Sequence, residues 1–391
     1  MKRVLSLLLS LTMTASLFMV TPVQAAEKQP AAEKYTATDY RKFTDVSGHW
    51  AGSYLKWAVN NRVMVGVTTT KMKPDANITR AQMATMITSA FGATQEADIS
   101  TFIDVPKDAW FHGAIAKAVQ MGFLETFGNS VSPNQAVTRE EVAVSLVKAA
   151  GYVVGANSSY VNKFTDAGKI NTNYAKYFAT AVQQGLLSGY GDGRVGPKDK
   201  VTRAQFATIL YRVANAYMNQ TMTYNSKNVE GSLMVGVGNV RLSGMKVTKN
   251  LFLSDGVGTG EVQLDNTTVG GVVYVRGTGP NTLYLKNNTR VAGIVFCNPN
   301  NAVHLVVDES SSVGWVNIHE SKDSVTLEGN VGDVTVDTGK APVTLVGAKV
   351  DDLNITGRLA AVKADKASTI NDIVLFDIAA GAVLETNGRV G

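Results

Sequence analysis

Apolar residues recur at helical spacing in the first half of the chain, and the pattern is repeated. One stripe consists of Met83, Met86, Ile87 and Phe91. Another consists of Phe206, Ile209, Leu210 and Val213. Apolar positions three or four residues apart line one face of a helix. We therefore expect helices that each present one apolar face, as a three-helix core requires.

Beyond residue 219 helical spacing disappears, and Val, Thr, Gly and Asn dominate. A motif of the form Val-x-x-apolar-x-apolar recurs about every twenty residues. It begins clearly at Val291, Val313, Val331, Val350 and Ile370, and looser versions begin at Val229, Val247 and Val269. A second short strand lies between, such as VQLDN at 262–266 or VTLEG at 325–329. Period-2 strands repeating at this interval predict a parallel β-solenoid, or β-helix. A β-sandwich is the alternative, since it also has short strands at regular spacing.

The first half also contains a repeated set of words. ITRAQ at 78–82, VTREE at 137–141 and VTRAQ at 201–205 each begin an apolar stripe. Related openings precede them: FTDVSGHW at 43–50, FIDVPKDAW at 102–110 and FTDAGKI at 164–170. Agreement in order, residue type and spacing indicates three copies of one unit.

The threonine of each word predicts a helix start. Thr-x-x-Glu/Gln is the capping box, in which the hydroxyl accepts a backbone N–H and the later side chain reaches back. The predicted capping pairs are Thr79 with Gln82, Thr138 with Glu141, and Thr202 with Gln205.

Capping does not explain the arginine that follows. Arg80, Arg139 and Arg203 lie in the first turn, where the helix dipole disfavours a cation by up to about 1 kcal/mol. One hypothesis is that free N–H groups and the guanidinium together bind a carboxylate or phosphate. The alternative is an ion pair within the repeat, and both can hold in different repeats. The aspartates available for such a pair are Asp45, Asp104 and Asp166.

Residues 42–218 resemble three S-layer homology repeats, the wall-anchoring module of bacterial surface proteins. The resemblance is carried by Phe-x-Asp-Val with a following tryptophan, by Gly-Tyr-Gly-Asp-Gly at 189–193, and by the Thr-Arg words. It implies a pseudo-threefold unit around a helix bundle, with grooves that hold an anionic, often pyruvylated, secondary cell-wall polysaccharide. The residues it assigns to polysaccharide binding are Trp50, Trp110, Arg80, Arg139 and Arg203, together with Gly189 and Asp192 of the glycine run.

The third repeat departs from this pattern. Asn173, with Tyr174 beside it, stands where the other repeats have tryptophan. The first two repeats lack the glycine-aspartate loop, which led us to expect Arg203 to contribute most to wall binding. For the tryptophans, plain core packing is the alternative to ligand contact.

The N-terminus has the form of a secretory signal. Lys2 and Arg3 precede an apolar run and small residues at Val23 and Ala25, which predicts a signal peptide at 1–25. A retained membrane anchor is the alternative. The net charge of +5 falls to +3 when Lys2 and Arg3 are removed, which fits an anionic wall polymer and is too weak to indicate nucleic acid. Because Cys297 is the only cysteine, no internal disulfide is expected.

The sequence offers little for catalysis. The four histidines have no metal-type spacing, so neither a metal nor a cofactor is expected. Carbohydrate-cleaving enzymes need paired carboxylates. The candidates are Asp308-Glu309, Asp333 and Asp351-Asp352, of which Asp333 and Asp352 occupy the third place of their coil motifs. A solvated corner is the favoured interpretation.

These observations divide the chain into a signal peptide (1–25), a linker (26–41), three repeats (42–97, 98–160 and 161–218) and a β-solenoid (219–391). We expect a secreted, non-catalytic surface protein that is held to anionic wall polysaccharide and displays the solenoid, with no membrane span after signal removal. One alternative is a wall-anchored polysaccharide lyase or hydrolase. Another is an adhesin or assembly module whose solenoid binds itself or another surface protein.

Overall fold

The structure is a computed structural model that describes residues 39–155, 157–278, 283–298, 301–319, 321, 323–339, 341–376 and 379–391. The predicted signal peptide, and the predicted linker up to residue 38, lie outside the described residues. No helix within these ranges is long and apolar enough to cross a membrane.

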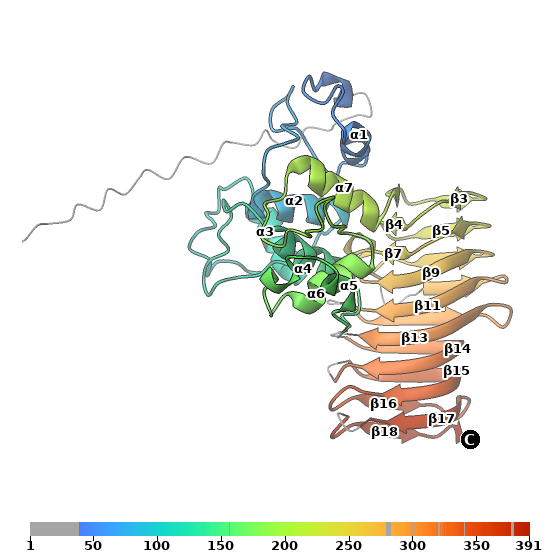
Figure 1. Cartoon of the computed structure of the whole chain (residues 1–391). Coiled ribbons are helices and arrows are strands. Elements are labelled where there is room, and N and C mark those ends of the chain that lie inside the picture. Colours follow the sequence, from blue (N-terminus) through green and yellow to red (C-terminus); the bar gives the residue numbers. More distant parts are fainter. Residues whose placement is uncertain are drawn as a thin grey trace, which may run out of the picture.

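Helices form the first part of the chain, a helical module at residues 42–214 (Figure 1). Each repeat has two principal helices, and the second begins at the arginine of the repeated word. The principal helices are α1 (Gly52–Asn60), α2 (Arg80–Ala90), α3 (His112–Gln120), α4 (Arg139–Ala150), α6 (Ala175–Gln183) and α7 (Arg203–Val213), with short helices η1 (Asp39–Lys42), α5 (Ser159–Asn162) and η2 (Ala167–Lys169).

The helices that pack in pairs come from different repeats. The first helix of each repeat lies against the second helix of the preceding one: α3 against α2, α6 against α4 and, closing the circle, α1 against α7. The expected threefold core is therefore a ring, because no repeat buries its apolar faces within itself.

Three backbone hydrogen bonds close the ring at the helix starts. Ile78 N donates to Val201 O (2.9 Å), Val201 N to Val137 O (3.2 Å), and Val137 N to Ile78 O (3.0 Å). The three side chains are completely buried. Each therefore satisfies a backbone group of the next repeat while it fills the centre of the core.

The second part of the chain is a parallel β-solenoid of about eight turns, which confirms the predicted fold. Strands of successive coils pair in parallel register to form three sheets. Sheet I consists of β2 (Thr223–Asn225), β5 (Val240–Ser243), β8 (Val262–Asp265), β10 (Leu283–Lys286), β12 (Val303–Val307), the starts of β14 (Val325–Asp337) and β15 (Val343–Ile355), β16 (Ala361–Ala364) and β18 (Val383–Thr386). Sheet II consists of β3 (Asn228–Val229), β6 (Lys246–Val247), the starts of β9 (Thr268–Val275), β11 (Arg290–Phe296), β13 (Ser312–His319) and β17 (Thr369–Leu375), the middles of β14 and β15, and β19 (Arg389–Val390). Sheet III consists of β1 (Ala216–Met218), β4 (Leu233–Val235), β7 (Leu251–Leu253) and the ends of β9, β11, β13, β14, β15 and β17.

The repeated valine of the sequence motif forms one inward column. All eight motif-initial residues, from Val229 to Ile370, are at most 4% exposed and lie in sheet II. In the four motifs that begin at Val291, Val313, Val331 and Val350, the apolar residues that follow point inward from sheet III. Aliphatic side chains from all three sheets thus share one continuous core.

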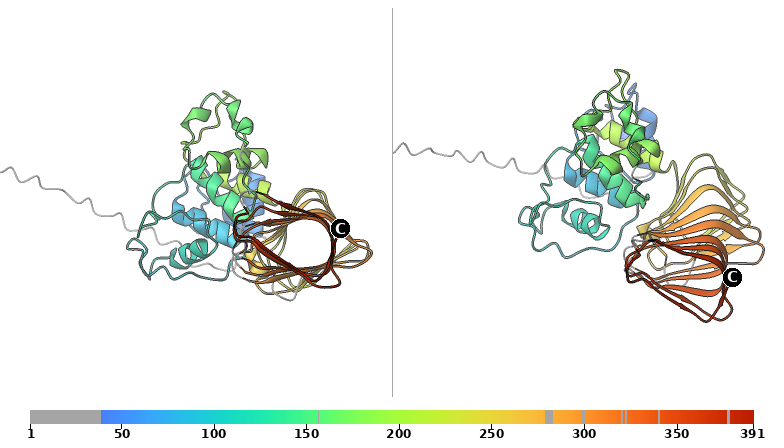
Figure 2. Two further views of the ribbon diagram at one scale, coloured as in Figure 1. Left: turned by 90° about the horizontal axis from the view of Figure 1, so that it is seen from below. Right: turned by 60° about the horizontal axis from the view of Figure 1, so that its bottom comes forward.

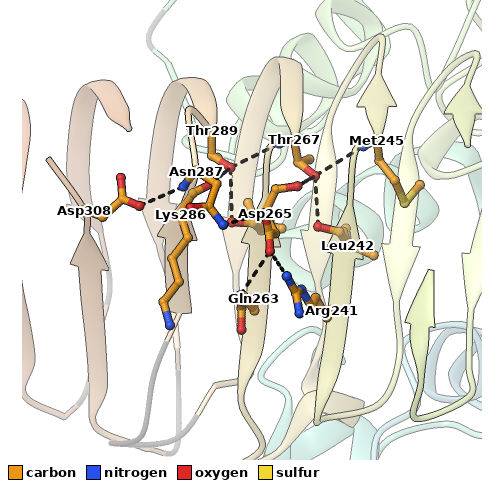
Figure 3. A network of polar contacts seen from close by, with 11 residues as sticks. Arg241, Leu242, Met245, Gln263, Asp265, Thr267, Lys286, Asn287, Thr289 and Asp308 are labelled. Carbon is orange, nitrogen blue, oxygen red and sulfur yellow. Dashed lines mark hydrogen bonds and ion pairs between the residues drawn. The ribbon is translucent and has the colours of Figure 1, made fainter. Parts of the chain in front are cut away.

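Hydroxyl and amide side chains fill the corner between sheets I and II (Figure 3). Thr267 N donates to Thr289 Oγ1 (3.1 Å), and Thr289 N donates to Ser311 Oγ (3.1 Å) on the next coil. Outside them, Asp265 accepts hydrogen bonds from Arg241 and from Asn287 Nδ2 (2.9 Å). Because the corner breaks the strand ladders, these side chains satisfy backbone groups that would otherwise lack partners.

The two parts of the chain share a close seam. β1 follows α7 after two residues, so the solenoid begins three residues before the boundary predicted at 219. Outward side chains of sheet III pack against the C-terminal ends of α2 and α4 and belong to the same apolar cluster as the helical core. These side chains are Met234, Phe252, Tyr274, Val295 and Cys297, none more than 6% exposed.

An aromatic trio and one arginine fasten the seam. Tyr152 meets the rings of Phe252 and Tyr274 edge-on, with centroids 5.9 and 5.0 Å away. Arg276 donates to Lys148 O (3.1 Å) and Met121 O (3.0 Å) and pairs with Asp255 at 2.8 Å. A guanidinium at the C-terminal carbonyls of α4 also matches the negative end of the helix dipole.

Candidate functional site

Each repeated word forms a full capping box. The side chains of Thr79, Thr138 and Thr202 accept a backbone N–H three residues on, and the side chain at that position accepts the N–H of the threonine. The following two N–H groups are also occupied. Arg80 N and Ala81 N donate to Gln135 O and Pro133 O of the next repeat, at 2.9 Å each, and the other two helices repeat this arrangement. The free N–H groups that the anion hypothesis required at these helix starts are therefore absent, since the neighbouring loop takes them.

The three arginines are buried and point into the next repeat. They are 1%, 6% and 2% exposed for Arg80, Arg139 and Arg203. Each donates to two backbone carbonyls of a neighbouring loop. Arg80 donates to Val131 O (2.6 Å) and Glu125 O, Arg139 to Val195 O (2.9 Å) and Ser188 O (2.8 Å), and Arg203 to Met72 O (2.6 Å) and Val65 O (2.5 Å). The cost of a cation in the first turn is thus offset by bonds that tie the ring together.

The aspartates of the openings do not form ion pairs with the arginine of their own repeat. Asp166 instead accepts the N–H groups of Val195 (2.8 Å) and Gly196 (2.9 Å), and Asp45 and Asp104 do the same in their repeats. Val195 therefore donates to Asp166 and accepts from Arg139. The alternative of an ion pair within one repeat is wrong. Asp166 accepts the N–H of Val195, and Arg139 donates to the carbonyl of the same residue across the repeat boundary.

Burial shifts the pKa values of the opening aspartates and of Arg203. It would raise the pKa of Asp166, but the two backbone N–H donors outweigh it and hold the pKa below its usual range. The pKa values of Asp45 and Asp104 are lowered in the same way. Burial lowers the pKa of Arg203 to about 10, opposed by the charge of Asp45 across the repeat boundary. At neutral pH all four groups therefore remain charged.

A first prediction concerns acid. Because the pKa of Asp166 is lower in the folded than in the unfolded chain, its contribution to stability is present above the unfolded value of about 3.9 and is lost as pH falls through the folded value. We expect Asp166→Asn to lower the free energy of unfolding at pH 7 by about 1.5–3 kcal/mol. Its acid-side slope should be shallower than that of the natural chain in denaturant titrations. Asp108→Asn, at an exposed position, is the control. An unaltered slope in Asp166→Asn would contradict this account.

In each repeat a groove lies between the loop that joins the two principal helices and the second of those helices. Groove 1 includes Arg62, Val65, Ser89 and Arg203. Groove 3 includes Lys163, Ser188, Tyr190 and Arg212. Each groove therefore has two basic side chains, and no carboxylate is among the residues that line it.

Groove 2 differs because the solenoid closes one side of it. It is lined by Gly122 and Lys148 of the helical module and by Arg276, His319 and Asp337 of the solenoid. Lys148 occupies the position that Ser89 and Arg212 have in the other repeats, nine residues after the motif arginine. The three repeats thus offer related grooves in unequal surroundings.

The tryptophans assigned by resemblance differ in exposure. Trp50 is 61% exposed and contacts His49, whose ring centroid is 5.5 Å away. Trp110 is half-buried against Phe111. In the third repeat Tyr174 donates to Glu125, whose carbonyl is also a partner of Arg80. Trp50 is thus the tryptophan most available to a ligand in the helical module.

The glycine run belongs with Arg139 rather than Arg203. A Cβ at Gly189 would lie 2.3 Å from the Phe164 ring, which explains the glycine. Tyr190 lies over the Arg139 guanidinium at 4.9 Å, and Asp192 is exposed and pairs with Arg194 at 2.8 Å. The reason for expecting Arg203 to dominate binding is therefore removed, since its partners lie in the first repeat.

The carboxylates that the sequence singled out in the solenoid lie in two different settings. Asp308 belongs to a corner and accepts from Asn287 N (2.7 Å). Asp333, Asp351 and Asp352 are exposed on the outside of the coils. Asp372 occupies the same place in the next motif and was missed in the sequence, although counting two residues on from Ile370 finds it. No cluster of three potential metal-binding side chains occurs in the described part of the chain.

Three segments of the chain match the S-layer homology domain: residues 42–84, 101–143 and 163–207. Among similar proteins, the surface-layer 125 kDa protein of Lysinibacillus sphaericus is 31% identical over 189 residues, which is 45% of this chain and 15% of that protein. The S-layer protein sap of Bacillus anthracis is 25% identical over 247 residues, or 62% of this chain and 28% of that protein. An amylopullulanase of Thermoanaerobacterium thermosulfurigenes is 28% identical over 181 residues, or 46% of this chain and 10% of that enzyme.

The chain therefore carries three S-layer homology domains followed by a parallel β-solenoid. Such domains indicate cell-wall anchoring, and the chain is a wall-associated protein of the cell surface. The match spans a tenth to about a quarter of the length of these relatives, which include both surface-layer proteins and an enzyme.

Proposed function

We propose that the helical module binds an anionic, pyruvylated wall polysaccharide through its grooves, and that the solenoid is a non-catalytic element carried by this anchor. The observation that supports it most is the pairing of basic side chains in grooves 1 and 3 without a carboxylate among the lining residues. A guanidinium can hold a ketal carboxylate with two parallel hydrogen bonds.

The motif arginines have an indirect part in this proposal. Arg139 binds the carbonyl of Ser188 in groove 3, and Arg203 binds the carbonyl of Val65 in groove 1, which Arg203 also lines. Direct contact with the polymer falls to exposed groups such as Arg62, Lys163 and Arg212, with Trp50 available to stack on a sugar. Gly189 and Asp192 shape the loop that borders groove 3.

Binding of the full chain to isolated cell walls tests the proposal. We expect Lys163→Gln with Arg212→Gln to weaken co-sedimentation by about tenfold or more, because a charge-assisted bond contributes on the order of 1.5–3 kcal/mol. Lys246→Gln, an equally exposed change of charge on sheet II, should bind as the natural chain does. Walls stripped of their anionic polymer should not retain the protein. Undiminished sedimentation with stripped walls would refute the proposal.

The non-catalytic role of the solenoid is supported by the setting of its carboxylates. Asp333 and Asp352 stand exposed on the face of a sheet, whereas glycoside cleavage needs two carboxyl groups that enclose one bond. A wall-anchored lyase or hydrolase is the second candidate. The similarity to an amylopullulanase concerns the wall-anchoring repeats and not the solenoid. Release of new reducing ends or unsaturated sugars from a polysaccharide by the full chain, abolished by Asp352→Asn, would establish it instead.

A further inference from the structure

The outward face of sheet III is divided into a covered and an open half. On β4, β7, β9 and β11 its side chains are apolar and lie beneath the helical module. The strands β13, β14, β15 and β17 continue the same sheet beyond the helices (Figures 1 and 2). The open face, as we call it, consists of Trp315, Asn317, Asp333, Asp352, Asn354 and Asp372.

Trp315 lies flat on this face. Its Cα partner on the preceding coil is Gly293, and a Cβ there would come within 2.1 Å of indole Cε2. The indole therefore occupies the space that the missing side chain leaves. The residue stays 37% exposed although it lies against the backbone. A large aromatic surface is thus held in one orientation and offered to solvent.

Three aspartates follow Trp315 along the same face, and we call them the aspartate column. Trp315 pairs with Asp333, and Asp352 pairs with Asp372 on the next coil. Between these pairs the register of β14 and β15 shifts, so that Asp351 and Asp352 together lie opposite Asp333. Neighbouring strands lie about 4.8 Å apart, so these carboxylates stand close enough to repel one another. Elsewhere on the solenoid opposite charges lie together, as in Lys363 and Glu385 on β16 and β18 (3.3 Å). Within the described residues no cation is paired with the aspartate column.

Beside this column run amides. Asn317 and Asn354 are half-buried on β13 and β15. The Asn317 Oδ1 atom is buried, and no described residue donates a hydrogen bond to it. Amide side chains can both donate to and accept from hydroxyl groups. The open face therefore combines an aromatic surface, unpaired negative charge and amide groups.

We propose that the open face binds a glycan that bears free amino groups. A tryptophan face beside a carboxylate is the arrangement that selects an organic ammonium group, by cation–π attraction and a charged hydrogen bond. Three successive coils each offer a carboxylate on this face, which suits a polymer with recurring amines. Because this face is acidic, it selects against the acidic polymer proposed for the grooves, and the two proposals stand independently.

A basic peptide fits these observations less well. Peptides commonly add to the free edge of a sheet through backbone hydrogen bonds. The backbone groups of β14 and β15 are instead paired with strands on both sides. Only side chains are therefore available to a ligand on the open face. Amides and an indole suit the hydroxyl groups and flat ring faces of a sugar chain.

Isothermal titration of the full chain with a glucosamine hexamer tests the inference, at mildly acidic pH where the amines are protonated and aspartates ionised. We expect saturable binding, and binding at least about tenfold weaker for the N-acetylglucosamine hexamer, which lacks the charge. Asp352→Asn should weaken binding of the amino form by about tenfold. Asp108→Asn changes the net charge equally at an exposed position of the helical module, away from the open face, and should leave binding unchanged.

Gly293→Ala supplies a second test that substitutes no residue of the open face. The added methyl group should displace the indole, and both binding and the change in tryptophan fluorescence on binding should be lost. Equal binding of the two hexamers would overturn the inference. So would equal losses in Asp108→Asn and Asp352→Asn, or a lysine hexamer that binds as tightly as the amino sugar. Retained binding in a folded Gly293→Ala variant would do the same.

Discussion

Arg80→Ala is expected to lower the free energy of unfolding of the helical module by about 3–5 kcal/mol, the range seen when one partner of a buried charged network is removed. The change leaves Val131 O and Glu125 O without their donor and Glu141 without its cation at 3.1 Å. Urea denaturation can be followed by tryptophan fluorescence, because Trp50, Trp57 and Trp110 all lie in this module.

Two further variants separate the ring contact from charge in general. Arg80→Lys keeps the charge but cannot reach several acceptors with one planar fork, so an intermediate loss is expected. Arg194→Ala removes an exposed arginine, 44% exposed at its side chain, and should destabilise the module far less than Arg80→Ala does. If Arg80→Ala were as stable as the natural chain yet failed to bind walls, Arg80 would be a ligand contact and not a tie between repeats.

Phe252→Ala is expected to open the seam between the helical module and the solenoid. Phe252 is 1% exposed, stacks on Tyr274 with centroids 5.2 Å apart, and meets Tyr152 of α4's C-terminal loop. Loss of a buried phenylalanine costs about 3–5 kcal/mol. Because the cost falls on the contact between the two parts, we expect a single unfolding transition to separate into two, with a larger radius of gyration in solution scattering.

Phe296→Ala is the matched control. Phe296 is equally buried but points into the solenoid core, away from the helices. The same residue type is lost at a similar cost, so the solenoid should be destabilised while scattering of the folded protein stays unchanged. If both variants expanded the protein alike, the seam would not depend on Phe252.

Local patterns in the sequence were sufficient where the interaction is local. The capping threonines bond to residues three positions away, and the words alone contain both partners. The solenoid was readable for a related reason. Each coil repeats the one before it, so a fixed interval between Val269, Val291 and Val313 reports a column of neighbours in space.

Partners distant in sequence were not readable. Arg203 bonds to Met72 and Val65, which precede it by 131 and 138 residues, and no local pattern distinguishes these loops from its own. Nor did the repeat predict that α1 packs against α7. Each repeat in the sequence contains two helices, but the two helices that pack together come from different repeats. The apolar Phe252 and Tyr274 indicated burial but not the partner that covers them.

One part of the open face was readable and was overlooked. Gly293, Trp315, Asp333, Asp352 and Asp372 all occupy the third place of successive motifs. The sequence singled out Asp333 and Asp352 because carboxylates were sought as a catalytic pair. A search by position instead of by residue type finds the whole column, including the tryptophan and the glycine beneath it.

Only two residues join α7 to β1, so the first coil of the solenoid is held directly against the helical module. With Arg276 and the aromatic trio beside that junction, a load applied to the distal coils is carried to the helical module as a turning moment and is not absorbed by a tether. The solenoid then acts as a lever whose length grows by about 4.8 Å for each added coil. Lengthening it would increase the strain on the wall contacts in proportion, so anchoring strength sets a mechanical limit on how far such a protein can project.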